Sequence, residues 1–495
     1  MLGLSASGYN SGMNSKVEIE LTHVAATGEA FGRDADGRVV LVADTIPGEI
    51  VEVEIVAEEE GWRRGILHTV VKASPDRVLA PCPHFGPRLP VKMADGKLLN
   101  PSWQSAGCAG CQWQQIDYER QLALKREIVV NILARDGGLG KARKQSRQIA
   151  EKLVADVIAL GAPEEDSFEG APAVLDFGFR TQMRFDFAHS KQLALAGRNG
   201  EHVVIDACLL HHPQLAELFA GFQNDRNGAD RAEEDESTPE SGLPVVDSVT
   251  LAVGGTADSL SETAKAVLLL HSDRDDPPSL ELEMPANVFL LHEGEEPSLE
   301  LLVGDWIYDV QVEGRQLTAY PPVGGSVGSG HLLADEVVAA VASEMLELKT
   351  FEHLLELWAG IGARAAILAE QVATVVAVAE TEFSAAALRA NLDGLDNADP
   401  WQGEMLSTIR KLRRGDYRFD AVLLSPPDGV IEPELFSLLT RMRIRRCGLV
   451  TDEPSRLARA LAEIDKAGYR LAAVQPIDLQ PHQPGVTLVA RFDRK

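Results

Sequence analysis

A strand that runs into a glycine turn and then into a helix constrains the fold of this chain more than any other feature. Residues 353–369 comprise an apolar strand, a turn with the sequence WAGIGA and an alanine-rich helix. A second apolar strand, 375–379, ends at Glu380. Strands that alternate with helices in this way predict a doubly wound, mostly parallel sheet. We therefore expect a Rossmann-like α/β domain over residues 321–495.

The glycine turn, with Gly360 and Gly362, indicates a ligand that carries a ribose. Glycine lets the polar groups of a ligand approach the backbone, and an acid such as Glu380 at the end of the next strand can accept hydrogen bonds from both ribose hydroxyls. Dinucleotide-binding domains share this pattern. The absence of a third glycine at the usual place favours S-adenosylmethionine instead. The alternative interpretation of Glu380 is a solvated acid at a strand end.

The N-terminal region has the alternating pattern of β-strands. Apolar residues at every second position in 17–21, 39–41 and 51–55 define one buried face, and glycine and proline turns separate the strands. Short strands at this spacing predict a small closed barrel of the OB type over residues 16–74. Such barrels often bind single-stranded nucleic acid, although a β module with another role fits the pattern equally well.

Four of the five cysteines could form a metal or cluster site. Cys108 and Cys111 are separated by two small residues, so one tight turn can present both thiols to one metal ion or one iron–sulfur cluster. Cys82 lies upstream and Cys208 far downstream. Four thiolates suit either tetrahedral zinc or a four-iron cluster. Reduced, unligated cysteines remain an alternative that the spacing does not exclude.

The region between the barrel and the α/β domain is rich in predicted strands. An amphipathic helix is expected over 117–134, and strand-like runs continue to residue 320. We expect a central β-rich domain over residues 75–320 that carries the cluster at its edge. Two segments, about 87–105 and 223–242, have the composition of inserted loops.

Length and composition indicate a cytoplasmic protein of several domains. A chain of 495 residues predicts two to four domains at roughly 100–200 residues each. Residues 1–15 are rich in Gly, Ser and Asn and are expected to form a flexible tail. They lack the basic start and the apolar run of a secretory signal. No apolar run approaches the ~20 residues of a membrane helix. A small, odd number of cysteines favours a reducing compartment. We expect a cytoplasmic monomer with no membrane partner and no DNA partner.

The charge distribution is uneven. A net charge of −28 by itself disfavours a nucleic-acid partner, because Lys and Arg dominate phosphate binding. Residues 223–242 contain seven acids and two bases, and we interpret this segment as a disordered loop. Basic runs occur at 141–152, 410–418 and 441–446. Each is more often a solvated helix face than a binding surface, so charge alone neither establishes nor excludes RNA.

An ordered series of short motifs adds a resemblance to a known family. The motifs are Pro47-Gly48-Glu49, Ser74-Pro75-Asp76-Arg77, Cys82-Pro83-His84-Phe85-Gly86, Cys108-Ala109-Gly110-Cys111-Gln112 and Tyr118-x-x-Gln121-Leu122-x-x-Lys125. This series resembles the bacterial RNA (uracil-5-)-methyltransferase family. Its members join a TRAM barrel, a four-iron cluster domain and a C-terminal methyltransferase domain. The resemblance covers roughly residues 17–495 and implies an α/β plus β architecture with these three parts.

The resemblance also implies two cofactors and an RNA partner, either ribosomal or transfer RNA. The implied ligands of a [4Fe-4S] cluster are Cys82, Cys108, Cys111 and Cys208. The implied S-adenosylmethionine residues are Glu356, Gly360, Gly362 and Glu380, and Asn391 is also retained. The spacer between the first and second cysteines is longer than in the family. A longer loop need not displace the thiols.

The reaction of the family has fixed chemical requirements. A cysteine thiolate attacks C6 of a flipped uridine, and C5 then takes the methyl group. A carboxylate base removes the C5 proton, and the thiol leaves. Sulfur suits this role because it is soft, nucleophilic and a good leaving group.

The chain departs from the family at these positions. Asp452 stands at the place of the nucleophile, and Cys447 lies five residues earlier, where a buried structural thiol is expected. The segments at the family's loop acid, base and Phe-Gln-x-Asn motif are Ser425-Pro426-Pro427-Asp428, Gly485-Val486-Thr487 and Pro321-Pro322-Val323-Gly324. We predict no catalytic residue for uridine methylation.

Three functions follow as hypotheses. The first is the reaction of the family, methyl transfer from S-adenosylmethionine to uridine C5. The second is a catalytically silent iron–sulfur scaffold that binds RNA. The third is methyl transfer to a different acceptor atom, with Ser425 to Asp428 beside it. The missing catalytic set favours loss of the family reaction.

Overall fold

The computed structural model describes residues 16–100, 107–160, 175–188, 192–198, 200–232, 246–255, 266–272, 286–293, 298–321, 330–427 and 432–495. The chain divides into two compact units. The first comprises Met1–Ile128, Leu195–Val203 and His482–Pro484, and the second comprises Val129–Ala194, Val204–Pro481 and Gly485–Lys495. The predicted tail lies outside the described residues, and the predicted four-part division stays a prediction.

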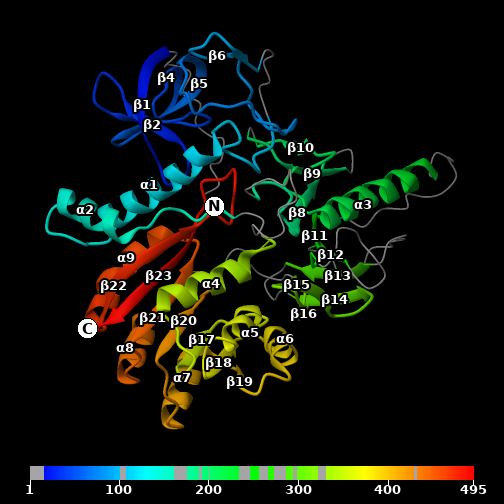
Figure 1. The fold of residues 1–495 in the computed structure, drawn as a ribbon. Coiled ribbons are helices and arrows are strands. Elements are labelled where there is room, and N and C mark those ends of the chain that lie inside the picture. The colour runs from blue at the N-terminus through cyan, green and yellow to red at the C-terminus, as the bar shows by residue number, and fades with distance from the viewer. Residues whose placement is uncertain are drawn as a thin grey trace. The chain divides into compact units, whose positions relative to one another are not determined.

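The first unit contains the predicted five-stranded barrel (Figure 1). Its strands are β1 (Lys16–Val24), β2 (Ala30–Arg33), β3 (Val39–Val42), β4 (Ile50–Glu59) and β5 (Trp62–Lys72). They close in the order β1-β2-β3-β5-β4, with β3 and β5 parallel and β1 paired to β4. Alternate residues such as Ile19 and Leu21 fill the interior, because successive side chains of a strand point to opposite faces. The barrel prediction is confirmed.

The predicted inserted loop over 87–105 is folded where the structure describes it. It contains the hairpin strands β6 (Val91–Lys92) and β7 (Leu98–Leu99). Leu89, Val91 and Leu99 join the core of the barrel. The burial of these three side chains explains why a segment without a periodic pattern is ordered.

Glu49 and Arg77, which belong to two of the quoted motifs, form a buried ion pair. Arg77 Nε donates to Glu49 Oε1 at 2.6 Å, and a second guanidinium nitrogen donates to Oε2 at 2.8 Å. Glu49 is fully buried and also accepts hydrogen bonds from the backbone N–H groups of Ile46 and Ser74. A buried ion pair is stable only when hydrogen bonds satisfy both charged groups, because both have lost their hydration. These motif residues therefore hold the end of the barrel together.

The helix predicted over 117–134 is α1 (Tyr118–Asp136). Its buried Gln121 side chain donates to the carbonyls of Trp113 and Ile116 and accepts from the backbone N–H of His482. A second helix, α2 (Arg143–Leu153), follows, and the extended residues after it run parallel to β22 (Tyr469–Ile477), with bridges from Val154 and Ile158. Across the described residues, every helix is too short or too polar to serve as a membrane span.

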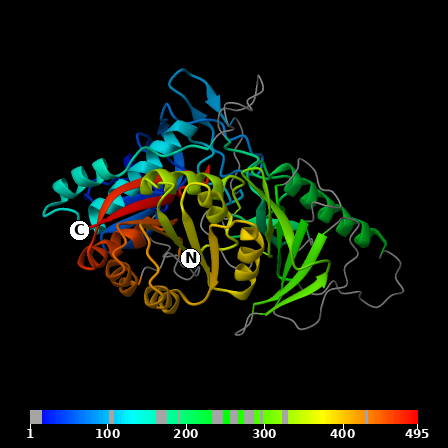
Figure 2. The ribbon, with the colours of Figure 1, turned by 60° about the horizontal axis from the view of Figure 1, so that its bottom comes forward.

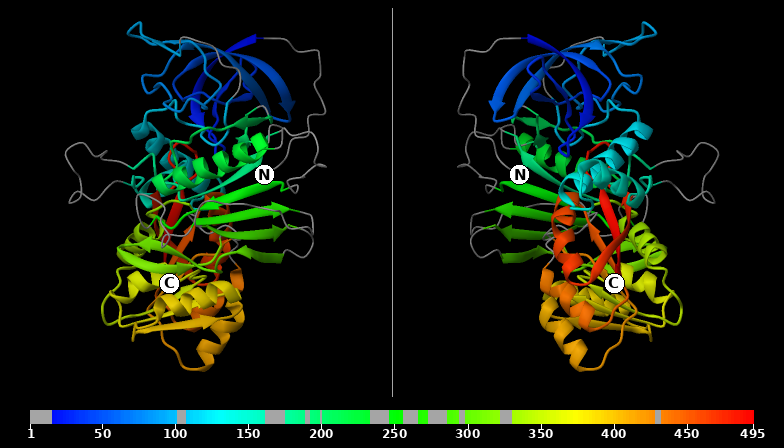
Figure 3. Two further views of the ribbon diagram at one scale, coloured as in Figure 1. Left: turned by 90° about the vertical axis from the view of Figure 1, so that its right-hand side faces the viewer. Right: turned by 90° about the vertical axis from the view of Figure 1, so that its left-hand side faces the viewer.

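A seven-stranded sheet follows in the order β10-β9-β8-β11-β12-β13-β14 (Figure 3). Its strands are β8 (Gln182–Phe187), β9 (Leu193–Ala196), β10 (His202–Val204), β11 (Ser248–Ala252), β12 (Ala266–Ser272), β13 (Ala286–His292) and β14 (Ser298–Val303). Every residue of β11 and β12 is buried, which places these strands at its centre. The hairpin β15 (Tyr308–Val312) and β16 (Arg315–Ala319) follows.

The prediction of a disordered loop over 223–242 is wrong for its first part. Helix α3 (Pro213–Ala232) continues through residues 223–232. Leu215, Leu218 and Phe222 bury its first turns, and the Gln223 side chain accepts from the N–H of Leu193. A helix that is nucleated by buried turns extends at little further cost, even through polar sequence. Residues 233–242 lie outside the described residues.

The C-terminal part of the second unit is the predicted doubly wound domain (Figure 2). Its strands are β17 (His353–Leu357), β18 (Thr374–Ala379), β19 (Ala398–Gln402), β20 (Ala421–Leu424), β21 (Arg446–Thr451), β22 and β23 (Thr487–Arg494). The order is β19-β18-β17-β20-β21-β23-β22, and β23 is antiparallel to both of its neighbours.

Helices cover both faces of this sheet. They are α4 (Ala334–Leu346), α5 (Ala363–Ala369), α6 (Glu382–Leu392), α7 (Met405–Arg414), α8 (Pro433–Arg441) and α9 (Pro454–Lys466). Helices α4, α5 and α6 contact one another in sequence, and so do α7, α8 and α9. Because the strands are buried between two helical layers, they are continuously apolar, as in β18 and β20.

Candidate functional site

The predicted ligand residues gather at the carboxyl edge of the doubly wound sheet. The loop after β17 contains Gly360 and Gly362, Glu380 follows β18, Ser425 follows β20, and Asp452 follows β21. Because β17, β18, β20 and β21 are parallel, their carboxyl ends lie at the same edge. Ligands of open α/β sheets bind at this edge.

The glycine loop has the backbone conformation that its sequence predicts. Gly360 and Gly362 have φ values of +58° and +86°. A Cβ atom at Gly362 would lie 2.6 Å from Leu388 Cδ1, so a larger residue cannot fit without a shift. The backbone N–H of Ala359 donates to Val378 O at 2.9 Å. The loop is therefore held close against the neighbouring strand.

Asn391 supports this loop from α6. Its side-chain amide donates to Ile361 O at 2.9 Å and to Thr318 O at 2.8 Å, and its carbonyl oxygen accepts from the N–H of Thr318 at 2.7 Å. All of these bonds go to backbone groups. Asn391 therefore positions the glycine loop relative to β16.

Glu356 is a fully buried carboxylate on β17. Its Oε1 atom accepts from Arg364 Nε at 3.1 Å, and Arg364 also donates to Asp335 at 2.8 Å. Its Oε2 atom is buried and has no hydrogen-bond partner. Burial raises the pKa of Glu356 to about 7, and the nearby Arg364 charge opposes this shift. A buried oxygen without a donor marks a place where a ligand can supply one.

Sequence reasoning missed Arg364 and Asp335. Arg364 is the single charged residue of α5, whose other residues are Ala, Ile and Leu. A single charged residue in an otherwise apolar helix could have indicated this ion pair, because a buried charge needs a partner of opposite charge.

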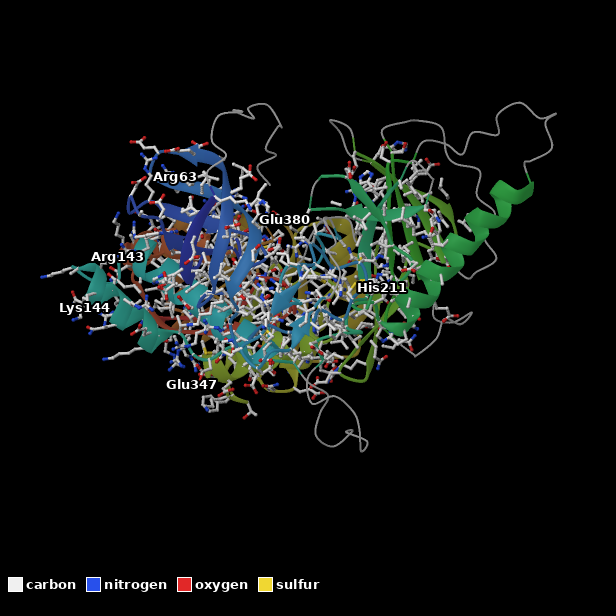
Figure 4. All side chains as sticks on the ribbon, turned by 90° about the horizontal axis from the view of Figure 1, so that it is seen from above. Arg63, Arg143, Lys144, His211, Glu347 and Glu380 are labelled. Carbon is white, nitrogen blue, oxygen red and sulfur yellow. The ribbon has the colours of Figure 1, made fainter. Side chains whose placement is uncertain are left out.

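Glu380, which is labelled in Figure 4, is exposed. The N-cap residue Thr381 follows it and accepts a hydrogen bond from the N–H of Ser384, so α6 begins directly after this acid. An exposed strand-end acid is available to a ribose and is equally consistent with a solvated residue.

Ser425 is buried at the end of β20. Its N–H donates to Leu357 O at 3.2 Å, which ties it to the strand before the glycine loop. Its hydroxyl oxygen is buried and has no hydrogen-bond partner. Asp428, the last residue of the predicted Ser-Pro-Pro-Asp loop, lies outside the described residues, as do residues 322–324.

Asp452 and Thr487 are in direct contact. The Thr487 hydroxyl donates a hydrogen bond to Asp452 Oδ1. The pairing of β21 with β23 explains this contact, because Thr451 pairs with Leu488. The two positions that the motif alignment predicts for the nucleophile and the base are therefore neighbours, and they hold a carboxylate and a hydroxyl.

Cys447 lies inside the sheet, as expected. It is the second residue of β21, it is completely buried, and burial raises the pKa of its thiol well above the ordinary range. A thiol of this kind is neither accessible nor ionised.

The first unit contains Cys82, Cys108 and Cys111, all buried. The N–H of Cys108 donates to His84 O at 2.8 Å, which holds the two motifs side by side. Burial raises the pKa of the Cys108 thiol, and a nearby charge on Cys82 raises it further. The N–H of Gly110 donates to Cys108 Sγ at 3.3 Å.

A half-buried arginine lies beside these thiols. Arg198 donates to Cys111 O at 2.8 Å, stacks over the Phe85 ring at 5.1 Å and pairs with Asp44. Burial lowers its pKa to about 10. It therefore remains cationic at neutral pH and can balance negative charge on thiolates.

The fourth predicted ligand, Cys208, belongs to the second unit. It is partly exposed and lies beyond the end of β10, in the turn before α3. Within the described part of the chain, no three His, Cys, Asp or Glu side chains form a group suited to one metal ion.

Comparison with known proteins gives relatives along almost the whole chain. No protein-family model matches. An uncharacterized RNA methyltransferase of Streptomyces avermitilis is 26% identical over 97% of this chain and 98% of its own. The 23S rRNA (uracil(1939)-C(5))-methyltransferase RlmD of Shewanella amazonensis is 26% identical over 96% of both chains.

A solved structure has the same overall fold. It is the Pyrococcus abyssi tRNA (uracil-54, C5)-methyltransferase in complex with S-adenosyl-L-homocysteine, with a TM-score of 0.63. It is 17% identical and covers 98% of this chain and 100% of its own. The relatives cover the whole motif series and both sheets. Over almost its whole length the chain is therefore similar in sequence to RNA methyltransferases, among them uracil-C5 methyltransferases, and it shares the fold of a uracil-C5 methyltransferase.

Proposed function

We propose that this protein binds S-adenosylmethionine and RNA but has lost methylation of uridine at C5. The observation that carries this proposal is the hydrogen bond from Thr487 to Asp452. Uridine methylation needs a thiolate at the first position and a proton-abstracting base at the second. A carboxylate is a poor nucleophile for C6 and would repel the negative charge that develops on the ring.

No other thiol replaces the missing nucleophile. Cys447 is buried in the middle of the domain, and the remaining cysteines belong to the proposed cluster. Thr487 has no basic function at neutral pH. On this alignment, the chain therefore lacks both the thiolate nucleophile and the base that uridine methylation requires.

The retained loop supports the binding of S-adenosylmethionine, which would supply the methyl group. Apart from its two chain neighbours, no described residue has an atom within 4 Å of the Cβ position at Gly360, which leaves that part of the backbone open to a ligand, and Glu380 offers a carboxylate to the ribose. The unpartnered Oε2 atom of Glu356 fits a donor such as the ammonium group of the methionine moiety.

The thiols of Cys82, Cys108 and Cys111, together with Cys208, are proposed to hold a [4Fe-4S] cluster. Soft thiolates are the donors that such a cluster takes. The cationic Arg198 supports the proposal, because a cluster with four thiolates is an anion. In a protein without uridine methylation, the cluster would support the fold or the docking of RNA.

A second candidate function is methyl transfer to another RNA atom. The buried, unpartnered hydroxyl of Ser425 favours it, because this group lies beside the glycine loop and can donate a hydrogen bond to an acceptor base. The second function keeps the same cofactor and the same RNA partner. It differs in the modified atom.

Methyl incorporation into RNA distinguishes these functions. Purified protein is incubated with unmodified ribosomal and transfer RNA and labelled S-adenosylmethionine, and the nucleosides are analysed by mass spectrometry. We expect no 5-methyluridine, and we expect that Asp452→Cys alone does not restore it, because the base is also absent. Labelled 5-methyluridine from the unmutated protein would refute the proposal. Label in another nucleoside would establish the second function.

Calorimetry with S-adenosylmethionine tests the cofactor separately. We expect binding by the unmutated protein and weaker binding by Glu380→Ala, because that change removes the proposed ribose acceptor. If no heat of binding is detected, the silent scaffold is the better description.

A further inference from the structure

We propose that α2 and the residue pair before it form a phosphate-binding surface for RNA, which we call the α2 basic strip. It consists of Lys141, Arg143, Lys144, Arg147 and Lys152. The inference rests on the proposed function, because it takes RNA as the ligand, and it adds the place where the backbone of that RNA is held.

The strip is a local exception in an acidic protein. Residues 141–152 contain five basic residues and one acid, whereas the whole chain has 47 Lys and Arg against 75 Asp and Glu. A chain with a net charge of −28 repels RNA unless basic residues are concentrated in one place. The α2 basic strip is such a concentration.

All five basic side chains are exposed, whereas Ser146 and Ala150 on the same helix are buried. In Figure 4, Arg143 and Lys144 extend outward from the ribbon of α2. Arg147 donates to Glu151 at 2.8 Å and to Asn131 at 3.0 Å. Among the described residues, the other four side chains of the strip form no ion pair. Their charges are therefore available to a partner.

The stability of α2 does not explain these charges. Arg143 and Lys144 lie in its first turn, where the helix dipole disfavours cations by roughly 0.3–1 kcal/mol each. The first turn contains no acid, and the N-cap residue Ala142 provides no side-chain cap. Folding alone would favour the opposite charges at these positions.

The other two basic runs have structural partners. Arg445 and Arg446 pair with Glu352, and Arg445 also pairs with Asp420. In the run over 410–418, Arg410 pairs with Glu434, and Lys411, Arg413 and Arg414 lie in the last turn of α7. Cations in the last turn stabilise a helix. In the α2 run, Arg147 pairs with Glu151 and Lys152 lies in the last turn of the helix. Among the described residues, the side chains of Lys141, Arg143 and Lys144 have neither kind of role.

The strip leads to the carboxyl edge of the doubly wound sheet. After α2 the chain runs parallel to β22, with bridges from Val154 to Val474 and from Ile158 to Ile477. Ile477 pairs with Thr487, which contacts Asp452. Four residues of extended chain span roughly 13 Å. Helix α2 adds up to roughly 15 Å between Arg143 and Leu153, at about 1.5 Å per residue. A strand of RNA whose base enters at this edge would therefore reach the strip with phosphates several nucleotides away.

Binding of a fluorescein-labelled, unmodified tRNA transcript to the full-length protein tests the inference. The variant is Arg143→Gln/Lys144→Gln, and the control is Lys411→Gln/Arg413→Gln, which removes the same charge from α7. Removal of two phosphate contacts should weaken binding by about tenfold at low salt and lower the slope of log Kd against log salt by roughly 1.4–1.8. The control should bind like the unmutated protein. Thermal melts should show that both variants are folded.

The outcomes separate this inference from the proposed function. Equal losses in the variant and the control would show an effect of net charge alone and would overturn the α2 basic strip. Unchanged binding by the α2 variant would also overturn it and would direct attention to an acidic protein partner for α2. If the unmutated protein does not bind the transcript, both this inference and the RNA-binding part of the proposed function fail.

Discussion

At the two positions that the motif alignment predicts for a thiol and a base, the chain has the carboxylate of Asp452 and the hydroxyl of Thr487, which donates to it. Each group satisfies the other, so neither needs a substrate. If only the thiol or only the base is restored, the other residue loses its hydrogen-bond partner. The reaction would also still lack one of its two catalytic groups.

The raised pKa of Glu356 predicts that the stability of the protein depends on pH. Its pKa is raised from 4.5 to about 7 by burial, so its contribution to stability is present below pH 4.5 and is lost as the pH rises through about 7. Glu356→Gln cannot ionise. Between pH 5 and pH 8 the variant should therefore gain about 1–3 kcal/mol of unfolding free energy relative to the unmutated protein.

Urea denaturation at each pH measures this difference. Glu404→Gln is the control, because hydrogen bonds from the N–H of Ser407 and other groups hold the pKa of Glu404 below its usual range. Its difference from the unmutated protein should stay constant between pH 5 and pH 8. A constant difference for Glu356→Gln would contradict the burial of a titrating carboxyl.

The buried pair of Glu49 and Arg77 gives a second prediction for single residues. Removal of one partner leaves an uncompensated buried charge, so Arg77→Met should lower the unfolding free energy by about 3–5 kcal/mol. Lys16→Gln breaks the exposed pair with Glu52 and should cost only about 0–1 kcal/mol. Similar losses in both variants, measured by urea denaturation, would show that the buried pair is unimportant.

At the scale of elements, the turn between β17 and α5 needs glycine for two reasons. Gly362 has a φ of +86°, and a Cβ atom would meet Leu388 at 2.6 Å. Gly394 has a similar φ of +82° but open space around it. We expect Gly394→Ala to cost only the backbone strain of about 1–2 kcal/mol.

Gly362→Ala should cost more than Gly394→Ala, because either the loop or the Leu388 side chain must shift to make room for the methyl group. The same shift should weaken the binding of S-adenosylmethionine by about tenfold. Thermal melts and calorimetry on both variants measure the two effects. Equal behaviour of the two variants in both measurements would show that the close contact with Leu388 has no role.

The elements also show where sequence patterns succeed and where they fail. Alternation predicted the barrel, and helical spacing predicted α1, because each pattern reflects one buried face. The patterns failed for the end of α3 and for the hairpin of β6 and β7. In these segments, buried residues such as Phe222 in α3 and Val91 in β6 stabilise the structure. The amino-acid composition of each segment does not predict this burial.

At the scale of the whole molecule, the proposed cluster can be tested by colour and metal content. Anaerobically purified protein should be brown, with broad visible absorbance, and Cys108→Ser should lose this absorbance, because Cys108 is a proposed ligand. Cys447→Ser should keep it, because Cys447 lies in β21. A colourless protein with stoichiometric zinc would overturn the cluster.

The sequence by itself determined the barrel, the doubly wound domain, the resemblance to uracil-C5 RNA methyltransferases and the absence of a thiol at position 452, because these depend on local pattern and on the order of motifs. Only the tertiary structure decided which side chains form hydrogen bonds and ion pairs with one another. It joined Thr487 to Asp452 and Arg364 to Glu356, and it left Glu356 Oε2 and the Ser425 hydroxyl unpartnered. It also distinguished the α2 basic strip from two basic runs with structural partners. Such contacts join residues that a sequence pattern cannot relate, because strand pairing and helix packing bring them together.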